Sequence, residues 1–173
     1  MSEAVAELKK ETLYNCKMVQ AQDGVSVESD TLGALLYPLE GDTFALDMVI
    51  KPERYHEFGI ALHVDKELET GYFLRMNPKN QLVAWDMWPR GEQGRYQWQI
   101  KGDVPYQIET ARKLPKAEEY RVHIIKEKDI CVVYINDEIV LSTRMYNHKD
   151  GYAGIYVVQG DVKLIQYKEK RSE

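Results

Sequence analysis

Hydrophobic and polar residues alternate with a period of two along most of this chain. The clearest runs are 44–50, 58–63 and 72–76, where large apolar side chains occupy every second position. Successive side chains of a strand point to opposite faces of its sheet, so this pattern predicts strands with one buried face. Similar runs predict further strands at 13–20, 24–28, 32–37, 81–88, 95–100, 119–127, 130–136, 138–145, 152–158 and 161–168.

Turn-forming residues separate these runs at short intervals. Examples are Asp23-Gly24, Glu40-Gly41-Asp42, Asn77-Pro78-Lys79-Asn80, Lys149-Asp150-Gly151 and Gly160-Asp161. Many short strands at such spacing predict an all-β fold, a two-sheet antiparallel β-sandwich of the jelly-roll or concanavalin-like type. Within it, residues 119–145 read as a three-strand meander. Residues 101–118 lack alternation, and we expect them to cross from one side of the sandwich to the other.

The N-terminus differs from the rest of the chain. Residues 3–10 favour a short helix, with Ser2 as its N-cap. We therefore expect a connector arm at residues 1–11 and a β-sandwich domain at residues 12–173. The length of 173 residues suits one domain with a substantial core.

Composition narrows the range of partners. Lys and Arg total 23 against 28 Asp and Glu, a net charge of −5, and no basic block occurs. Nucleic acid and anionic membranes are therefore poor candidate partners. No apolar run approaches the roughly 18 residues of a membrane helix. The first ten residues do not resemble a secretory signal, which favours the cytoplasm while leaving the compartment open. We expect Cys16 and Cys131 to be reduced thiols, with a disulfide as the alternative.

An aromatic and charged segment is the first candidate for chemistry. Trp85, Asp86, Trp88, Arg90, Tyr96 and Trp98 lie within 14 residues. Aromatic rings can cover the apolar face of a sugar while Asp and Arg bind its hydroxyls. The alternative is structural: Trp85 belongs to the core, and Asp86 to Arg90 fix the end of a strand. Alternation allows Asp86 and Trp88, but not Trp85 and Asp86, to share a face.

Glu57, Arg75 and Asp86 form a second candidate group. They would meet if the strands at 56–64, 70–76 and 81–88 are neighbours. The alternative is a network of paired charges on a solvated sheet face.

Metal and nucleophilic sites find little support. The four histidines share no ligand spacing, and the turn aspartates form no Asp-x-Asp cluster. We expect no cofactor and no metal, with calcium as the minor alternative. Ser142 has no Gly-x-Ser-x-Gly context.

Two blocks carry a family resemblance. One runs from Tyr134 through Asn136-Asp137 to Leu141-Ser142-Thr143-Arg144-Met145-Tyr146, and the other is Asp86-Met87-Trp88-Pro89-Arg90. Both resemble the last domain of family 32 glycoside hydrolases, the invertases, levanases and inulinases. Residues 71–75, 151–157 and 4–8 are similar to further strands of that domain and to the segment that joins it to the rest. The resemblance implies a β-sandwich appended to a catalytic propeller.

The same resemblance argues against catalysis. Family 32 enzymes use an Asp in Asn-Asp-Pro, an Asp in Arg-Asp-Pro and a Glu in Glu-Cys, and this sequence contains none of these motifs. We therefore predict a non-enzymatic domain that packs against and stabilises the propeller of a fructan- or sucrose-cleaving hydrolase.

The alternative is an autonomous module that binds the β-fructosyl ends of levan or inulin. Related fructan-binding modules hold a terminal fructose with acidic and Arg side chains. The resemblance thus gives the candidate saccharide-binding residues Asp86, Trp88, Arg90, Arg75 and Glu57. The expected partners are a catalytic propeller and fructose-containing saccharides.

Overall fold

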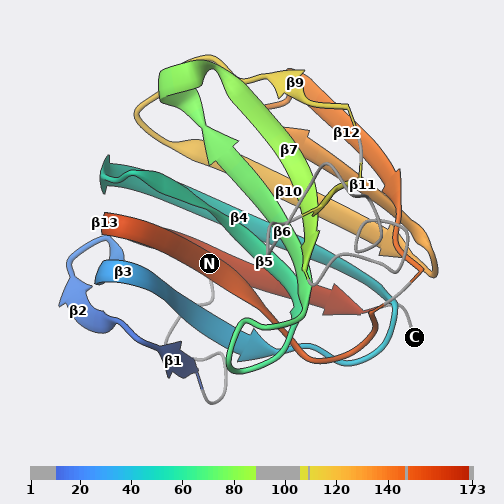
Figure 1. The fold of residues 1–173 in the computed structure, drawn as a ribbon, viewed down its shortest axis with the longest axis horizontal. Coiled ribbons are helices and arrows are strands. Elements are labelled where there is room, and N and C mark those ends of the chain that lie inside the picture. The colour runs from blue at the N-terminus through green and yellow to red at the C-terminus, as the bar shows by residue number, and fades with distance from the viewer. Residues whose placement is uncertain (1–10, 89–105, 109, 147, 172–173) are drawn as a thin grey trace, which may run out of the picture.

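Antiparallel β-sheet makes up nearly all of the described chain (Figure 1). The computed structural model describes residues 11–88, 106–108, 110–146 and 148–171. The predicted helix at 3–10, the predicted strand at 95–100 and the candidate residue Arg90 lie outside the described residues. Within the described part, no helix is long and apolar enough to cross a membrane.

The strands follow the predicted alternation. They are β1 (Thr12–Tyr14), β2 (Lys17–Ala21), β3 (Gly24–Pro38), β4 (Thr43–Arg54), β5 (Glu57–Val64), β6 (Gly71–Asn77), β7 (Leu82–Trp88), β8 (Tyr106–Gln107), β9 (Arg112–Lys113), β10 (Tyr120–Glu127), β11 (Ile130–Ile135), β12 (Ile139–Arg144) and β13 (Tyr152–Arg171). A single 3₁₀ turn, η2 (Pro78–Asn80), joins β6 to β7.

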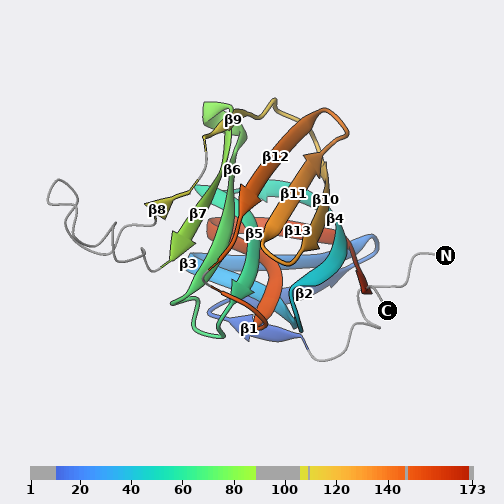
Figure 2. The same ribbon diagram turned by 90° about the vertical axis from the view of Figure 1, so that its right-hand side faces the viewer.

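Strand pairing joins the described strands in one continuous sheet, which folds into two layers (Figure 2). The front layer, which faces the viewer in Figure 1, contains β1, the second half of β3, the first half of β13, and β5, β6 and β7, with β8 and β9 on β7. The back layer contains β2, the first half of β3, the second half of β13, and β4, β10, β11 and β12. This arrangement confirms an antiparallel β-sandwich, although its two layers belong to one continuous sheet and not to two separate sheets.

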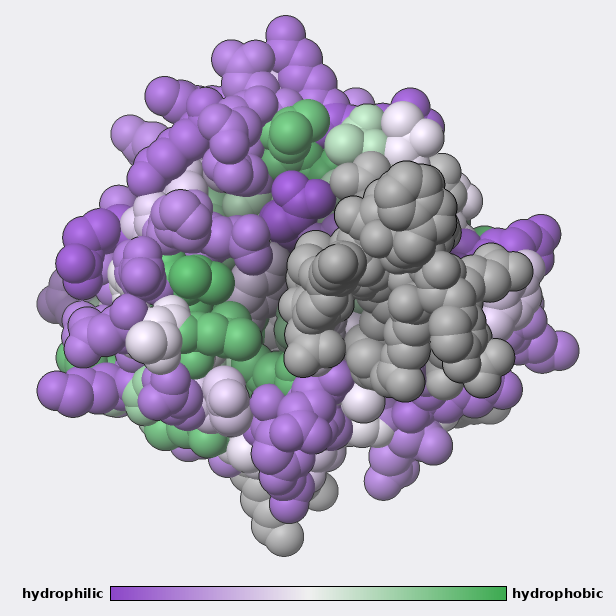
Figure 3. All heavy atoms as spheres, in the orientation of Figure 1, coloured by the Kyte–Doolittle hydropathy of each residue, from purple (hydrophilic) through white to green (hydrophobic). Residues whose placement is uncertain are grey.

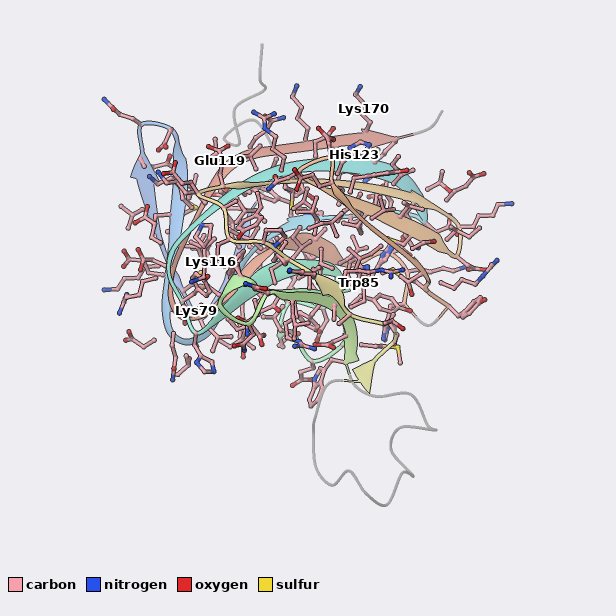
Figure 4. The ribbon with its side chains drawn as sticks, turned by 90° about the horizontal axis from the view of Figure 1, so that it is seen from above. Lys79, Trp85, Lys116, Glu119, His123 and Lys170 are labelled. Carbon is pink, nitrogen blue, oxygen red and sulfur yellow. The ribbon has the colours of Figure 1, made fainter. Side chains whose placement is uncertain are left out.

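The core lies between the two layers. Its main cluster joins inward-facing side chains of both, among them Leu46 and Ile124 from the back layer and Leu74 and Trp85 from the front layer. Trp85 is fully buried, and Figure 4 shows it between the layers, while His123 and Lys170 lie on the outer side of the back layer. The structural reading of Trp85 is therefore correct.

Strands β3 and β13 each pass through both layers, which the sequence pattern did not reveal. We predicted separate strands at 24–28 and 32–37, and at 152–158 and 161–168, with a turn at Gly160-Asp161. That turn is wrong. The chain instead stays in strand pairing through a register shift between Val158 and Gly160, with Gln159 in a left-handed conformation. A Cβ at Gly160 would lie 1.9 Å from the carbonyl oxygen of Arg54, so only glycine fits there.

The strand predicted at 13–20 is also divided. Asn15 has a φ of 46°, which ends β1 and interrupts the strand before β2 continues in the same direction along β3. The predicted meander at 119–145 is confirmed as β10, β11 and β12, and its second turn places both Asn136 and Asp137 at positive φ. Such a pair matches the right-handed twist of the flanking strands. Cys16 and Cys131 are unpaired thiols.

Candidate functional site

Four of the five predicted site residues lie on the outer face of the front layer. Glu57 begins β5, Arg75 lies in β6, and Asp86 and Trp88 belong to the end of β7. The three strands are hydrogen-bonded neighbours in the order β5, β6, β7. Because alternation sends Trp85 into the core, it sends Asp86 and Trp88 to the opposite, outer face.

Arg75 and Asp86 form an ion pair across neighbouring strands. The Arg75 Nε donates to Asp86 Oδ2 at 2.8 Å, and a guanidinium Nη lies 3.5 Å from Oδ1. The Asp86 side chain is only 9% exposed, so little water competes with this pair. Hydrogen bonding to Asp86 raises the pKa of Arg75. The pair therefore presents a fixed, charged and partly desolvated surface.

Glu57 and Tyr156 form a second polar pair beside the first. The Tyr156 hydroxyl donates to Glu57 Oε2 at 3.2 Å, which links β13 to β5. Burial raises the pKa of Glu57, and it also raises the pKa of Tyr156 well above its ordinary value. Arg75 lies close enough to oppose the shift of Glu57. Titratable groups with such perturbed pKa values gather at functional sites more often than elsewhere.

A small apolar cluster surrounds these polar pairs. We call it the outer cluster; its buried members are Ala34, Leu36, Ala61, Val64, Leu68 and Tyr156, with Tyr14, Leu32, Phe73, Tyr152 and Val158 packed against it. The Phe73 and Tyr156 rings meet edge to face, with centroids 5.5 Å apart. Figure 3 shows hydrophobic side chains gathered on this face among hydrophilic ones.

Asp86, the Glu57–Tyr156 pair and part of the outer cluster line one cavity of about 560 Å³, the front cavity. Its walls are Tyr14, Leu32, Glu57, Glu67, Leu68, Glu69, Phe73, Asp86, Trp88, Tyr156 and Val158. Small-molecule sites combine aromatic and apolar walls with a few convergent polar groups, as this cavity does. A cavity of about 580 Å³ beside β1 and β2 has walls of mostly short polar side chains without an aromatic ring, so it fits this description less well.

The loop at residues 65–70 forms one rim of the front cavity. Asp65 Oδ1 accepts hydrogen bonds from the backbone N–H groups of Glu69 at 2.7 Å and Thr70 at 2.8 Å, and this closes the loop on itself. Leu68 adopts a φ of 56° and is only 5% exposed, because its side chain packs into the outer cluster. Glu67 and Glu69 on either side remain exposed at the rim.

The sequence analysis named Glu57, Asp86 and Trp88 of this cavity, but it missed the other wall residues, including the charged Glu67 and Glu69. Tyr156 was assigned to a strand without a role, and Phe73 was read only as part of the alternation. The alternation does indicate that Tyr156 and Val158 face away from the core, because they alternate with the core residues Ile155 and Val157. The loop residues carry no recognisable motif.

Metal binding has no visible support in this part of the molecule. Within the residues that the structure describes, no group of three or more His, Cys, Asp or Glu side chains could hold a metal ion.

Comparison with solved structures identifies the fold as an antiparallel β-sandwich of the lectin-like type. The sequence matches no protein-family model, and no curated protein sequence is significantly similar to it. Among solved structures, the carbohydrate binding module CBM66 from Bacillus subtilis superposes with a TM-score of 0.77 at 16% identity, covering 95% of this chain and 97% of that chain.

Two further structures share the architecture. The exoplasmic/lumenal domain of VIP36, in its Ca²⁺/Man3GlcNAc-bound form, gives a TM-score of 0.66 at 11% identity and covers 98% of this chain and 86% of that one. Chicken galectin 2 gives a TM-score of 0.53 at 9% identity, covering 82% of this chain and 98% of its own. At these identities the likeness establishes the fold, a lectin-like antiparallel β-sandwich.

Proposed function

We propose that this protein is a non-catalytic carbohydrate-binding module and that the front cavity holds the end of a saccharide. The observation that carries the proposal is that Asp86, held by Arg75, and the Glu57–Tyr156 pair line one cavity. The aromatic side chains of Tyr14, Phe73 and Trp88 line the same cavity. Sugar hydroxyls need fixed donors and acceptors, and the apolar face of a sugar ring packs against aromatic side chains. The similarity of fold to CBM66 and to VIP36 agrees with this proposal.

The resemblance to family 32 hydrolases narrows the ligand to β-fructosyl ends. A furanose carries vicinal hydroxyls that could bridge the Asp86 and Glu57 carboxylates, with the Arg75 guanidinium beside them. The residues that carry the resemblance near the site are Asp86 and Trp88. The same chain would then recognise levan or inulin oligosaccharides by their ends.

Calorimetric titration with levan and inulin oligosaccharides, sucrose and fructose tests the proposal. We expect saturable heat with at least one of them, and a loss of affinity of at least tenfold in Asp86→Asn. Asp161→Asn is a matched control, because it removes another carboxylate that ion-pairs with an arginine, Arg54, outside the site. Equal affinities in the two variants, or no heat with any of these saccharides, would reject the proposal.

A second function, docking to a catalytic domain, is favoured by the outer face of the back layer. Ile125 is 41% exposed, Tyr134 36% and Val140 47%, and the three lie on the neighbouring strands β10, β11 and β12. Exposed apolar patches of this kind occur at protein interfaces. The test is gel filtration with the catalytic propeller of a fructan hydrolase added. Co-elution that Val140→Glu abolishes would support docking, and separate elution would reject it.

A further inference from the structure

The front cavity is strongly acidic, and this bears on which saccharides it would hold. The inference rests on the proposed function. Within the described chain, its walls contribute the carboxylates of Glu57, Glu67, Glu69 and Asp86 and no lysine or arginine side chain. Arg75 lies next to the wall and pairs with Asp86. One guanidinium therefore offsets one of four carboxylates.

The carboxylates differ in how well they are compensated. Asp86 has the full ion pair with Arg75, whereas the hydrogen-bond partner of Glu57 is the neutral phenol of Tyr156. Burial raises the pKa of Glu57, so the cost of desolvating its anion outweighs the stabilisation that Tyr156 and Arg75 provide. A ligand cation placed near Glu57 would stabilise its carboxylate anion.

The rim carries two more carboxylates on a loop whose backbone is held in place. Glu67 and Glu69 flank Leu68, which is anchored in the outer cluster, and Asp65 closes the loop through two backbone hydrogen bonds. These contacts hold the loop backbone at the mouth of the cavity, which keeps the two exposed carboxylates near it. An incoming anion would meet them first, and an incoming cation would be attracted.

The aromatic walls also favour a positively charged ligand. Tyr14, Phe73 and Trp88 line the cavity together with these carboxylates. The faces of aromatic rings attract ammonium groups, and they do so more strongly where water is partly excluded. Rings and carboxylates together make a surface that accepts a hydroxyl but gains more from a protonated amine.

We propose that the front cavity selects saccharide ends by charge. Ends that carry a protonated amine bind more tightly than neutral ends, and ends that carry a carboxylate are rejected.

Three trisaccharide classes test this by NMR titration at 150 mM salt, followed at the backbone amides of Gly59, Leu68 and Phe73. The probes are the glucosamine trisaccharide, two neutral trisaccharides (1-kestotriose and N-acetylated chitotriose) and trigalacturonate. We expect the glucosamine trisaccharide to have a Kd at least fivefold below that of either neutral probe, and trigalacturonate to cause no shifts at these amides.

Charge variants separate site recognition from general attraction to an acidic protein. In the double variant Glu67→Gln, Glu69→Gln, the preference for the amine should fall below twofold while the Kd of any bound neutral probe is unchanged. Glu138→Gln, on the distant β11–β12 hairpin, removes an exposed carboxylate and should leave the preference intact.

Each remaining outcome has a definite meaning. Neutral binding without a preference for the amine, or binding of trigalacturonate, overturns the charge selection and leaves the proposed function standing. The absence of shifts with every probe overturns both. An equal loss of preference in the Glu138→Gln control also overturns the selection, because it shows that net charge alone is responsible.

Discussion

His63 is a buried histidine whose environment fixes its protonation state. His63 is only 3% exposed, and its Nδ1 lies 2.9 Å from the backbone oxygen of Asp150. A carbonyl oxygen can only accept, so Nδ1 carries the proton and Nε2 is left as an acceptor. Burial, with a smaller contribution from the nearby ammonium of Lys126, lowers the pKa of His63 to about 4.

The pH dependence of stability follows from this shift. The unfolded chain binds the His63 proton more tightly than the folded protein, so the stability is fully present above the ordinary pKa of 6.5 and is lost as the pH falls toward 4. Between pH 7.5 and pH 5 we expect a loss of about 2 kcal/mol from this residue. Urea unfolding at the two pH values measures it. His63→Phe should be less stable at pH 7.5 but should show a flatter pH profile, and an equally steep profile would contradict the assignment.

The pKa of Glu57 shifts in the opposite direction to that of His63, because folding favours its protonated form. Its raised pKa means that its contribution to stability is complete below its ordinary pKa of 4.5 and is lost as the pH rises through the folded-state value. At pH 7, Glu57→Gln should therefore raise the midpoint of thermal unfolding by up to about 2 °C and weaken saccharide binding at least threefold. Calorimetry gives both quantities. A variant that is less stable and binds normally would show that Glu57 is structural.

Residue-level prediction from the sequence succeeded where alternation alone decides the outcome. The opposite placement of Trp85 and Asp86 follows from the period of two, and the structure agrees. Tyr156 could not be found in this way, because its partner Glu57 is 99 residues away and nothing local marks the contact. The front cavity therefore depends on strand order, which alternation does not encode.

At the level of elements, the front cavity depends on the close approach of β5 to β6 at Gly59, beside the cavity residue Tyr156. A Cβ at this position would lie 1.9 Å from the backbone oxygen of Leu74 in β6 and 2.9 Å from a ring carbon of Tyr156. Any side chain at Gly59 must push β5 away from β6, next to the residues that would hold the ligand.

Gly59→Ala should cost about 3 kcal/mol of unfolding free energy and should abolish saccharide binding. Gly41→Ala is the control: a Cβ there meets nothing within 4 Å, although its φ of 79° is unfavourable for alanine. That change should cost only about 1 kcal/mol and leave binding intact. Urea unfolding and calorimetry of both variants provide the comparison. Similar losses in the two variants would contradict the role of the close contact.

Strand boundaries were predictable only where a true turn interrupts the chain. The β10–β11–β12 meander was identified because Asn136-Asp137 is a strong hairpin signal. Gly160-Asp161 looks equally strong, yet there glycine serves a bulge inside β13. The local sequence cannot distinguish the two, because the difference lies in whether Arg54 of another strand passes alongside.

At the level of the whole molecule, β3 and β13 tie the two layers together. Each strand pairs with the other in both layers, and residues from both halves of each enter the main core cluster. Neither layer has an independent core. We therefore expect a single cooperative unfolding transition, as is usual for small single domains.

NMR spectra recorded along a urea titration test this cooperativity. Amide signals of Leu74 in the front layer and Ile124 in the back layer should disappear at the same midpoint, within about 0.2 M urea. Loss of the front-layer signal at a clearly lower concentration would show that the layers fold separately.

The passage of β13 through both layers also limits which residues of the front cavity can be substituted during evolution. Tyr156 faces the front cavity, while Ile155 and Val157 on either side of it belong to the core, so substitutions along this strand risk the fold. Substitutions of Glu67 and Glu69 do not carry this risk, because both project from an exposed loop that Asp65 and Leu68 hold in place. Among descendants of this protein, new ligand preferences should therefore arise by variation at the rim, while the floor is inherited unchanged.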